Sequence, residues 1–320
     1  MRILITGVCG QDGYYLSRQL AEEGHDVYGL VHRQKVQELP YGRIVRGDLA
    51  DTSSIFNAVE QVKPHEIYNM GAVCHVQYSY QHPELTLDIN GTGLVRILEA
   101  VKRFTPSAKV YQASTSELFG PGTPPFDEDS PMNPVSPYAI AKHNAHQIAR
   151  IYRKMGIWVS CGILFNHVSP LSGTEFIMNK LIKSAYGVQS GEIAAVPIGN
   201  LTAKRDFGCA PEYCDGIIRI MRHTEPLDLV LSTGVSVSIA ELAAFIFDRF
   251  DLQFEEWAYL DEDLVRPVDI PELRGDSTKA VSLIGWKHYK LWDEIAVDLI
   301  EAFYGEYVNT LGGYRCRSFC

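Results

Sequence analysis

Short apolar runs alternate with amphipathic segments along the first half of the chain. The apolar runs predict strands at residues 2–6, 26–31, 43–45, 66–69, 109–113 and 158–164. The segments between them repeat apolar residues every three or four positions, which predicts helices at 13–23, 52–62, 86–103 and 136–155. Such alternation is typical of a parallel sheet with helices on both faces. We therefore expect an α/β fold built on a doubly wound parallel sheet.

The second half of the chain has a less regular pattern. It predicts a strand at 228–232 and helices at 211–221 and 239–250, separated by irregular, polar segments at 165–170, 199–206 and 266–269. We expect a nucleotide-binding domain over residues 1–164, to which 208–234 returns. A smaller C-terminal substrate lobe would then comprise 165–207 and 235–320.

A glycine-rich turn follows the first predicted strand. Gly7, Gly10 and Gly13 stand in the order Gly-Val-Cys-Gly-Gln-Asp-Gly. Glycines at this spacing let the chain turn tightly and let its backbone approach a pyrophosphate, whose charge the following helix N-terminus stabilises. An ordinary strand-to-helix turn would also accept glycine. The next strand, however, arrives at the distance of a βαβ unit, which favours a Rossmann dinucleotide site.

The end of the second predicted strand indicates which dinucleotide binds. NAD sites usually place an acid there for the ribose hydroxyls, whereas an arginine accommodates the 2′-phosphate of NADP. This chain has Val31-His32-Arg33 and no acid, which predicts NADP. Asp48 is a candidate adenine contact, although Asp48 or Asp51 would also suit the N-cap of the next helix.

Candidate acid–base groups lie in residues 110–120 and 138–142. The first segment ends in Ser114, Thr115, Ser116 and Glu117. The second places Tyr138 and Lys142 four residues apart, hence on one face of a helix. An ammonium beside a phenol favours the phenolate, so we expect Lys142 to lower the pKa of Tyr138. Glu117 would be a second, independent proton-transfer group.

Composition is that of a cytoplasmic enzyme. The 320 residues carry a formal net charge of −10, which argues against a nucleic acid or anionic membrane as partner. No apolar run approaches bilayer length. Seven cysteines, with Cys9, Cys74 and Cys161 in apolar elements, favour reduced core thiols. Cys316 and Cys320 have no other Cys or His cluster nearby, so no metal site is expected.

These motifs together resemble those of extended short-chain dehydrogenases/reductases and, within that superfamily, the GDP-mannose 4,6-dehydratase family. The resemblance runs from the first strand to about Trp286. It rests on the motifs GVCGQDG (7–13), QASTSELFG (112–120), SPYAIAK (136–142), GILFNH (162–167), GNLTAKRDFG (199–208) and RPVD (266–269). The Gln11-Asp12 pair and the Asn200 to Asp206 block are specific to this dehydratase group. The Tyr–Lys pair is shared by the whole superfamily.

The resemblance implies an internal redox reaction on a nucleotide sugar with NADP. Tyr138 would take the proton of the sugar 4-hydroxyl, Glu117 would act at C5 and at the 6-hydroxyl, and Thr115 would bind the 4-oxygen. Lys142 would lower the pKa of Tyr138 and hold the nicotinamide ribose. The implied cofactor contacts are Gly7, Gly10, Gln11, Asp12, Gly13, Arg33, Asp48, Leu49, Ala72, Tyr138, Lys142, Leu164, Asn166 and His167. The implied substrate contacts are Ser116, Asn166, Lys180, Arg205, Arg266 and Asp269.

Two departures from the family pattern bear on assembly and specificity. Only a short segment, 34–41, stands where the family has a longer arm, so we expect a homodimer, with a tetramer as the alternative. Residues 171–176 lack the family's arginine pair, so the sugar preference is less defined than the reaction type. The alternative function is a GDP-4-keto-6-deoxymannose reductase, or another nucleotide-sugar dehydratase or epimerase on this scaffold. Intact Glu117, Tyr138 and Lys142 argue against a non-catalytic NADP-binding regulator.

Overall fold

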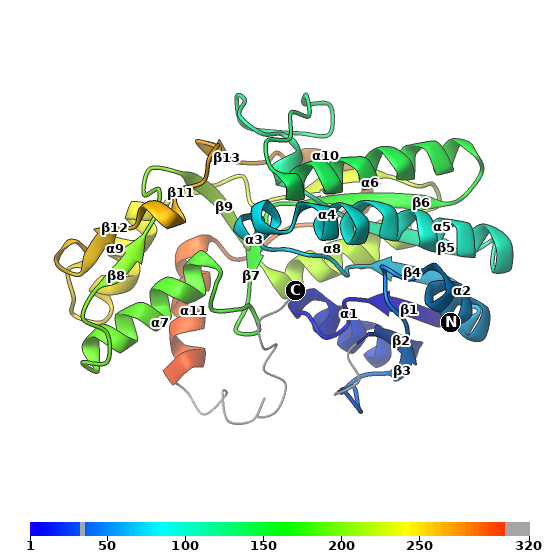
Figure 1. The fold of residues 1–320 in the computed structure, drawn as a ribbon, viewed down its shortest axis with the longest axis horizontal. Helices are drawn as coiled ribbons and strands as arrows, with labels where there is room; N and C mark the ends of the chain where they lie inside the picture. Colours follow the sequence, from blue (N-terminus) through cyan, green and yellow to red (C-terminus); the bar gives the residue numbers. More distant parts are fainter. Residues whose placement is uncertain (33–35, 305–320) are drawn as a thin grey trace.

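The computed structural model describes residues 1–32 and 36–304 and is built around one parallel sheet. Its strands run in the order β10-β6-β5-β4-β1-β2-β3, and every neighbouring pair is parallel. They are β1 (Arg2–Thr6), β2 (Asp26–Val31), β3 (Arg43–Arg46), β4 (Glu66–Asn69), β5 (Lys109–Thr115), β6 (Val159–Leu164) and β10 (Asp228–Leu231). The chain builds outward from β1 in one direction and from β4 in the other, which confirms the doubly wound Rossmann fold (Figure 1). Ligands bind such sheets beyond the strand ends, near the β1–β4 reversal.

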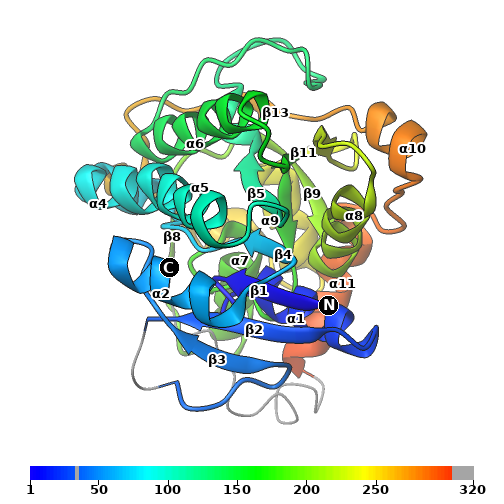
Figure 2. The ribbon, with the colours of Figure 1, turned by 90° about the vertical axis from the view of Figure 1, so that its right-hand side faces the viewer.

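Helices cover both faces of this sheet (Figure 2). Alternate residues of β1 show the division: Leu4 packs in the core beneath α2, α5 and α6, whereas Ile3 and Ile5 pack in the core with α1 and α8. The period of two along a strand explains why neighbours enter different cores. The covering helices are α1 (Gln11–Glu22), α2 (Thr52–Val62), α5 (Gly93–Phe104), α6 (Pro137–Lys154) and α8 (Ala210–Arg222).

The connection between β4 and β5 differs from the single helix expected at 86–103. It begins earlier, as α3 (Val76–Gln81) and α4 (Pro83–Leu87), and continues through a wider π turn (Asp88–Thr92) into α5. Pro83 has no amide hydrogen and stands at the first position of α4, where none is needed, so it separates α3 from α4. Strand β5 also runs two residues beyond the predicted 109–113, because Ser114 and Thr115 stay paired with β6.

A second group of elements forms a separate apolar core. Helices α7 (Ile177–Gln189), α9 (Ile239–Asp248) and α11 (Trp292–Tyr304) contribute to it, and they gather on the left of Figure 1. The short strands nearby are β7 (Asn166–Val168), β8 (Val196–Ile198), β9 (Lys204–Cys209), β11 (Ser236–Ser238), β12 (Ala258–Leu260) and β13 (Glu272–Leu273). The remaining helices are α10 (Thr278–Ile284) and the 3₁₀ turns Ser116–Leu118, Phe254–Glu256 and Glu262–Leu264.

Two segments expected to be irregular contain strands. Residues 166–168 form β7 and residues 204–209 form β9, and the two pair in parallel. The sequence pattern hides β9 because Arg205 and Asp206 are charged yet buried, with Asp206 accepting hydrogen bonds from the Thr233 and Gly234 amides. Two charged residues interrupt the apolar run that would otherwise predict a buried strand.

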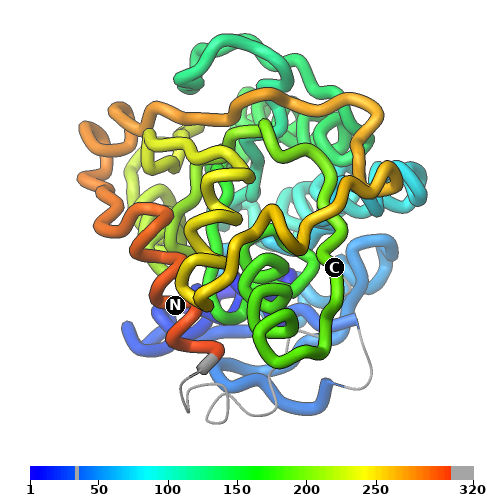
Figure 3. The backbone as a smooth tube through the Cα atoms, turned by 90° about the vertical axis from the view of Figure 1, so that its left-hand side faces the viewer, coloured from blue at the N-terminus to red at the C-terminus, as the bar shows by residue number. Residues whose placement is uncertain are grey.

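The proline-rich segment 121–136 forms most of the connection between β5 and α6. Phe126 pairs with the strand-like segment around Gly275, with hydrogen bonds of 2.9 Å to the Arg274 carbonyl and 2.8 Å from the Asp276 amide. Figure 3 shows the two segments passing close together (teal and orange). Chain regions some 150 residues apart in sequence are thereby joined next to the strand that carries Thr115 and Glu117.

The cysteines differ in state from the expected set of reduced core thiols. Cys161 is a free, buried thiol as expected, whereas Cys74 is disulfide-bonded, and that expectation is wrong for it. Cys74 follows β4 and is half-buried. Across residues 1–32 and 36–304 no helix combines the length and apolar character needed to cross a membrane.

Candidate active site

The glycine turn packs its backbone tightly at the N-terminus of α1. A Cβ on Gly7, whose φ is +65°, would lie 2.7 Å from the Gly71 amide nitrogen, and one on Gly13 would lie 2.3 Å from the Gly7 carbonyl oxygen. Only glycine fits either position. Gly10 precedes α1 and no side chain caps the helix, so its first amides are available to an anion. A dinucleotide pyrophosphate fits this cradle.

Gln11, Asp12 and His167 meet beside this turn. The His167 Nε2 lies 3.1 Å from both Asp12 carboxylate oxygens, and its Nδ1 donates to the Phe165 carbonyl at 2.7 Å. Both acceptors lack a hydrogen, so the ring carries a proton on each nitrogen. Burial opposes the charge, but Asp12 outweighs it and raises the pKa of His167. Burial likewise opposes the Asp12 charge, yet His167 and Gln11 keep the pKa of Asp12 below its usual range.

Contacts of Gln11 and His167 join α1 to β7 and to the residues that follow it. Gln11 donates to the His167 carbonyl at 3.3 Å and accepts from the hydroxyls of Ser169 and Ser172. The His167 ring also stacks on Tyr213 at 4.8 Å. The first turn of α1 is therefore held in place by residues that follow β6.

The strand ends beyond β1 contain the other predicted dinucleotide contacts. Asp51, not Asp48, caps α2 by accepting from the Ser53 amide at 2.9 Å. Asp48 is half-buried and accepts from the Ala50 amide, and Leu49 packs against Gly71, next to Ala72. Leu164 is the last residue of β6, and it lies at the same edge of the sheet because the strands are parallel. Arg33 lies outside the described residues.

Tyr138 and Lys142 lie on the face of α6 that meets the end of β5. The Lys142 Nζ donates to the Ala113 carbonyl at 3.0 Å and lies 6.0 Å from the centre of the Tyr138 ring. Thr115 hydrogen-bonds the Tyr138 hydroxyl, and the Tyr138 amide donates to Ser79 at 3.1 Å. Thus Thr115, Tyr138 and Lys142, which the sequence separates, form one group.

The expectation that Lys142 lowers the pKa of Tyr138 is wrong in this structure. Burial raises the pKa of Tyr138 to about 12, and the hydrogen bond from Thr115 only partly offsets this rise. Burial also lowers the pKa of Lys142 to about 8. The reason is geometric: the ammonium is directed at the Ala113 carbonyl and not at the phenol oxygen. A positive charge bound close to the phenol would lower the pKa of Tyr138.

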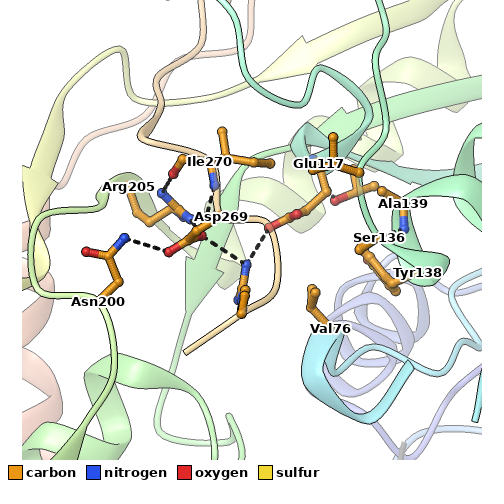
Figure 4. Close-up of polar contacts among 12 residues, drawn as sticks. Val76, Glu117, Ser136, Tyr138, Ala139, Asn200, Arg205, Asp269 and Ile270 are labelled. Carbon is orange, nitrogen blue, oxygen red and sulfur yellow. Dashed lines mark hydrogen bonds and ion pairs between the residues drawn. The ribbon is translucent and has the colours of Figure 1, made fainter. Parts of the chain in front are cut away.

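Glu117 follows Thr115 in the 3₁₀ turn after β5 and faces a charged cluster. Its carboxylate lies 3.4 Å from the Arg266 guanidinium, which also lies 3.8 Å from Asp269. Asp269 in turn accepts from Arg205 at 3.1 Å and from Asn200 at 2.8 Å (Figure 4). Glu117 is thus placed between the Tyr138 end of α6 and a group of cations suited to phosphate.

The cations of this cluster are not equivalent. The Arg205 side chain is only 8% exposed and donates to the Lys204 and Ile270 carbonyls as well as to Asp269. Arg266 is 30% exposed and makes only long contacts. Arg205 therefore holds the cluster together, and Arg266 is the arginine better placed to move onto a ligand.

Three other predicted substrate residues make no direct contact with this cluster in the part of the chain that the structure describes. Ser116 is buried in the 3₁₀ turn, and Asn166 is exposed on β7. The Lys180 ammonium donates to the Pro197 carbonyl at 2.8 Å rather than to the Asp269 group. The structure therefore brings Glu117, Arg205, Arg266 and Asp269 together directly, with Lys180 apart on α7.

Sequence reasoning missed a buried polar chain beneath the site. Thr6 donates to Asn69 at 2.7 Å, Asn69 to Gln112 at 2.7 Å, and Gln112 to the Ala113 carbonyl at 2.7 Å, the same oxygen that Lys142 contacts. These side chains join the ends of β1, β4 and β5. The available signal was a polar residue at the end of each buried strand. The hydrogen bond that Asn200 donates to Asp269 was not predicted either.

Comparison with known proteins gives one consistent result. The family model described as GDP-mannose 4,6 dehydratase matches residues 4–298. GDP-mannose 4,6 dehydratase 1 of Arabidopsis thaliana is 34% identical over 304 residues, covering 89% of this chain and 84% of the relative. GDP-mannose 4,6 dehydratase of Homo sapiens is 35% identical over 336 residues, covering 93% and 90%. Among solved structures, UDP-glucose 4-epimerase of Thermus thermophilus in complex with NAD has a TM-score of 0.84 at 20% identity, covering 95% and 99%, which shows a shared fold.

Proposed function

Because this chain belongs to the GDP-mannose 4,6-dehydratase family, we propose that it converts GDP-mannose to GDP-4-keto-6-deoxymannose with loss of water. The observation that carries the proposal is the convergence of Thr115, Tyr138 and Lys142 with Glu117 at the end of β5. Two separate proton-transfer groups face one place, and a dehydration coupled to redox needs two.

The glycine cradle supports a nicotinamide dinucleotide as cofactor. Gly7 and Gly13 allow the tight backbone turn that a pyrophosphate site needs, and the first turn of α1 supplies amides for the charge. When bound, the cofactor would accept a hydride from sugar C4 and return it at C6. We propose NADP over NAD because Val31 and His32 end β2 with no acid to bind the ribose hydroxyls.

Tyr138 and Thr115 would act on the sugar 4-hydroxyl. The Tyr138 oxygen takes the hydroxyl proton as C4 is oxidised, and the Thr115 hydroxyl hydrogen-bonds the 4-oxygen. With its pKa raised to about 12, Tyr138 ionises poorly until a positive charge is bound nearby. Proton removal would therefore be tied to occupation of the dinucleotide site, where Lys142 would also contact the nicotinamide ribose.

Glu117 would carry out the elimination. The new 4-ketone acidifies C5, so the Glu117 carboxylate can remove the C5 proton. The C6–O bond then breaks, and the protonated Glu117 gives its proton to the departing hydroxyl, which leaves as water. When the hydride is returned at C6, C5 would take up one proton, and Tyr138 can supply it because it holds the proton of the 4-hydroxyl. The short 3₁₀ turn places Glu117 two residues from Thr115, so both groups can reach one sugar.

The charged cluster would bind the other end of the substrate. Arg266 is the proposed diphosphate contact because it is exposed and loosely held, with Arg205 and Asp269 fixing its surroundings. Lys180 and Asn166 would complete the nucleotide site as the substrate enters. Arginine suits this role because its planar fork binds phosphate oxygens in pairs.

We propose the domain division stated from the sequence, with the substrate lobe at 165–207 and 235–320. The separate apolar core formed by α7, α9 and α11 supports it. We also propose a cytoplasmic homodimer, with a tetramer as the alternative state. The net charge of −10 supports an enzyme without a nucleic-acid partner.

The function is tested by incubating GDP-mannose with purified enzyme and no added reductant. The expected product has lost one water, and the NADP content is unchanged at the end. If the sugar survives, and a 4-keto-6-deoxy sugar is instead reduced only when NADPH is supplied, the protein is a reductase and the proposal is wrong.

A further inference from the structure

The face of α6 that carries Tyr138 and Lys142 continues for one more turn to His146. Residues four apart share a helix face, so all three point toward the same strand. Each contacts a different residue of β5: Tyr138 bonds to Thr115, Lys142 to the Ala113 carbonyl, and His146 to the hydroxyl of Ser114, at 3.1 Å from Nδ1. The strand end beneath the reaction site is thus held at three consecutive residues.

His146 is held in one protonation state. Its side chain is 0% exposed, and burial lowers the pKa of His146 to about 4, so the ring is neutral. Its Nε2 lies 3.7 Å from the carboxylate of Asp228, which can only accept. The single ring proton is therefore favoured on Nε2. That leaves Nδ1 as an acceptor, and the Ser114 hydroxyl donates to it.

The far side of His146 is anchored outside the site. Asp228 at the start of β10 binds Arg150 at 3.1 Å and Arg153 at 2.5 Å, both on the same helix as His146. Within the described residues, His146 Nε2 makes no hydrogen bond of its own. Its ring is oriented by the Asp228 charge and by close packing.

The order Ser114, His146, Asp228 suggests a hydrolytic triad, but the geometry does not suit one. Ser114 is 4% exposed, so a substrate carbonyl cannot reach its oxygen. The Asp228 charge is already neutralised by two arginines, so little remains to stabilise an imidazolium. The hydrogen bond to Ser114 therefore acts on the position of the strand.

We propose that His146 is a positioning residue for the dehydration: by holding Ser114 it fixes the adjacent Thr115 hydroxyl against Tyr138. The inference rests on the proposed function, in which Thr115 and Tyr138 act on the 4-hydroxyl. A displacement of about 1 Å at a reacting group can cost on the order of 100-fold in rate. Ser114 immediately precedes Thr115. If Ser114 loses its hydrogen bond to His146, a shift of the Ser114 backbone therefore moves Thr115 as well.

The test compares His146→Leu with His146→Asn. Leucine fills the space and cannot accept from Ser114, whereas an asparagine amide oxygen can stand near the Nδ1 position. We expect His146→Leu to lower kcat about 10- to 100-fold with KM within about 2-fold, by analogy with misplaced reacting groups. His146→Asn should recover most of kcat. His143→Asn, on a neighbouring face of the same helix, is the matched control and should keep wild-type kcat.

Ser114→Ala tests the same contact without disturbing the packing around His146. It should lower kcat as His146→Leu does, and the double variant should be no slower than either single variant, since one hydrogen bond is removed in all three. The inference is overturned if His146→Leu retains wild-type kcat, if His146→Asn is as slow as His146→Leu, or if the two losses multiply. A wild-type enzyme with no dehydratase activity would instead remove the proposed function on which the inference rests.

Discussion

At the scale of single residues, Tyr138 and Glu117 divide the proton transfers between them. They come from different elements, α6 and the 3₁₀ turn after β5, and their surroundings differ. Burial raises the pKa of Tyr138, and the carboxylates of Glu117 and Asp12 add to this rise. Glu117 lies beside the Arg266 cation. The two proton-transfer groups therefore lie in different electrostatic surroundings.

Replacing Glu117 by Gln should block elimination while leaving oxidation at C4 possible. The amide keeps the shape of the side chain but cannot take the C5 proton, so overall turnover should fall about 10²- to 10⁴-fold, the usual contribution of a general acid–base group. The measurement is the rate of water loss by mass spectrometry, together with exchange of the C5 hydrogen in D₂O. Glu262→Gln, at an exposed carboxylate, is the control. Wild-type turnover in Glu117→Gln would show that another group is the C5 base.

How far residues could be assigned from the sequence depended on whether their partners are local. The Tyr138–Lys142 spacing is fixed by the helix, so the sequence predicted that both lie on one face. It did not predict that the Lys142 ammonium turns to the Ala113 carbonyl, because that oxygen belongs to a strand some thirty residues away. For the same reason the high pKa of Tyr138, which follows from tertiary burial, was not predicted.

At the scale of elements, α1 and β7 are joined by the partly buried Asp12–His167 pair. The pKa of His167 is raised, so its contribution to stability is complete below its usual value of 6.5 and is lost as the pH rises through the raised pKa. The pKa of Asp12 is lowered, so its contribution is complete above 3.8 and is lost as the pH falls through the lowered pKa. The pair is therefore most stabilising between these two limits.

The Asp12→Asn variant tests this window through melting temperature. Against wild type, the loss of Tm should be largest between about pH 4 and 6.5, where both groups are charged, and should shrink toward pH 9. A hydrogen-bonded charged contact contributes about 1.5–3 kcal/mol. Glu22→Gln, which breaks the exposed Arg18–Glu22 pair, is the control and should change Tm little. A Tm difference that stays constant from pH 5 to 9 would contradict an ionised His167.

The glycine turn gives a second prediction at this scale. A Cβ in Gly13→Ala would meet the Gly7 carbonyl oxygen at 2.3 Å, and both are backbone-defined positions that cannot move aside independently. Dinucleotide affinity should fall about 10-fold or more, equivalent to at least 1.4 kcal/mol. Titration of protein fluorescence with NADP measures this directly. Gly91→Ala, where the nearest atom is 3.5 Å away, should bind as wild type. Unchanged affinity in Gly13→Ala would exclude the turn as the pyrophosphate site.

At the scale of the whole molecule, the regular first half was predictable, whereas in the second half only α8, β10 and α9 followed from the sequence pattern. The strands β1 to β6 are apolar runs with local turn signals, so their order and the doubly wound sheet followed from the sequence. The site residues of the second half depend on contacts such as Arg205 with Asp269, across sixty-four positions of the chain. β9 was not predicted because it carries the charged residues Arg205 and Asp206. Hydrogen bonds to distant segments stabilise these two residues in the interior. Arg205 could still be proposed as a diphosphate contact from its place in the Ala-Lys-Arg-Asp-Phe segment, and the resemblance to a known family implies the same role.

The central claim is that one site oxidises C4, eliminates water and reduces C6 of the same sugar. The most direct test supplies GDP-mannose carrying deuterium at C4 and locates the label in the product by NMR. The account predicts deuterium on the C6 methyl group, with no label released to water and no added reductant consumed. Product lacking the label at C6, or product formed only when NADPH is supplied, would contradict an internal transfer between the two carbons.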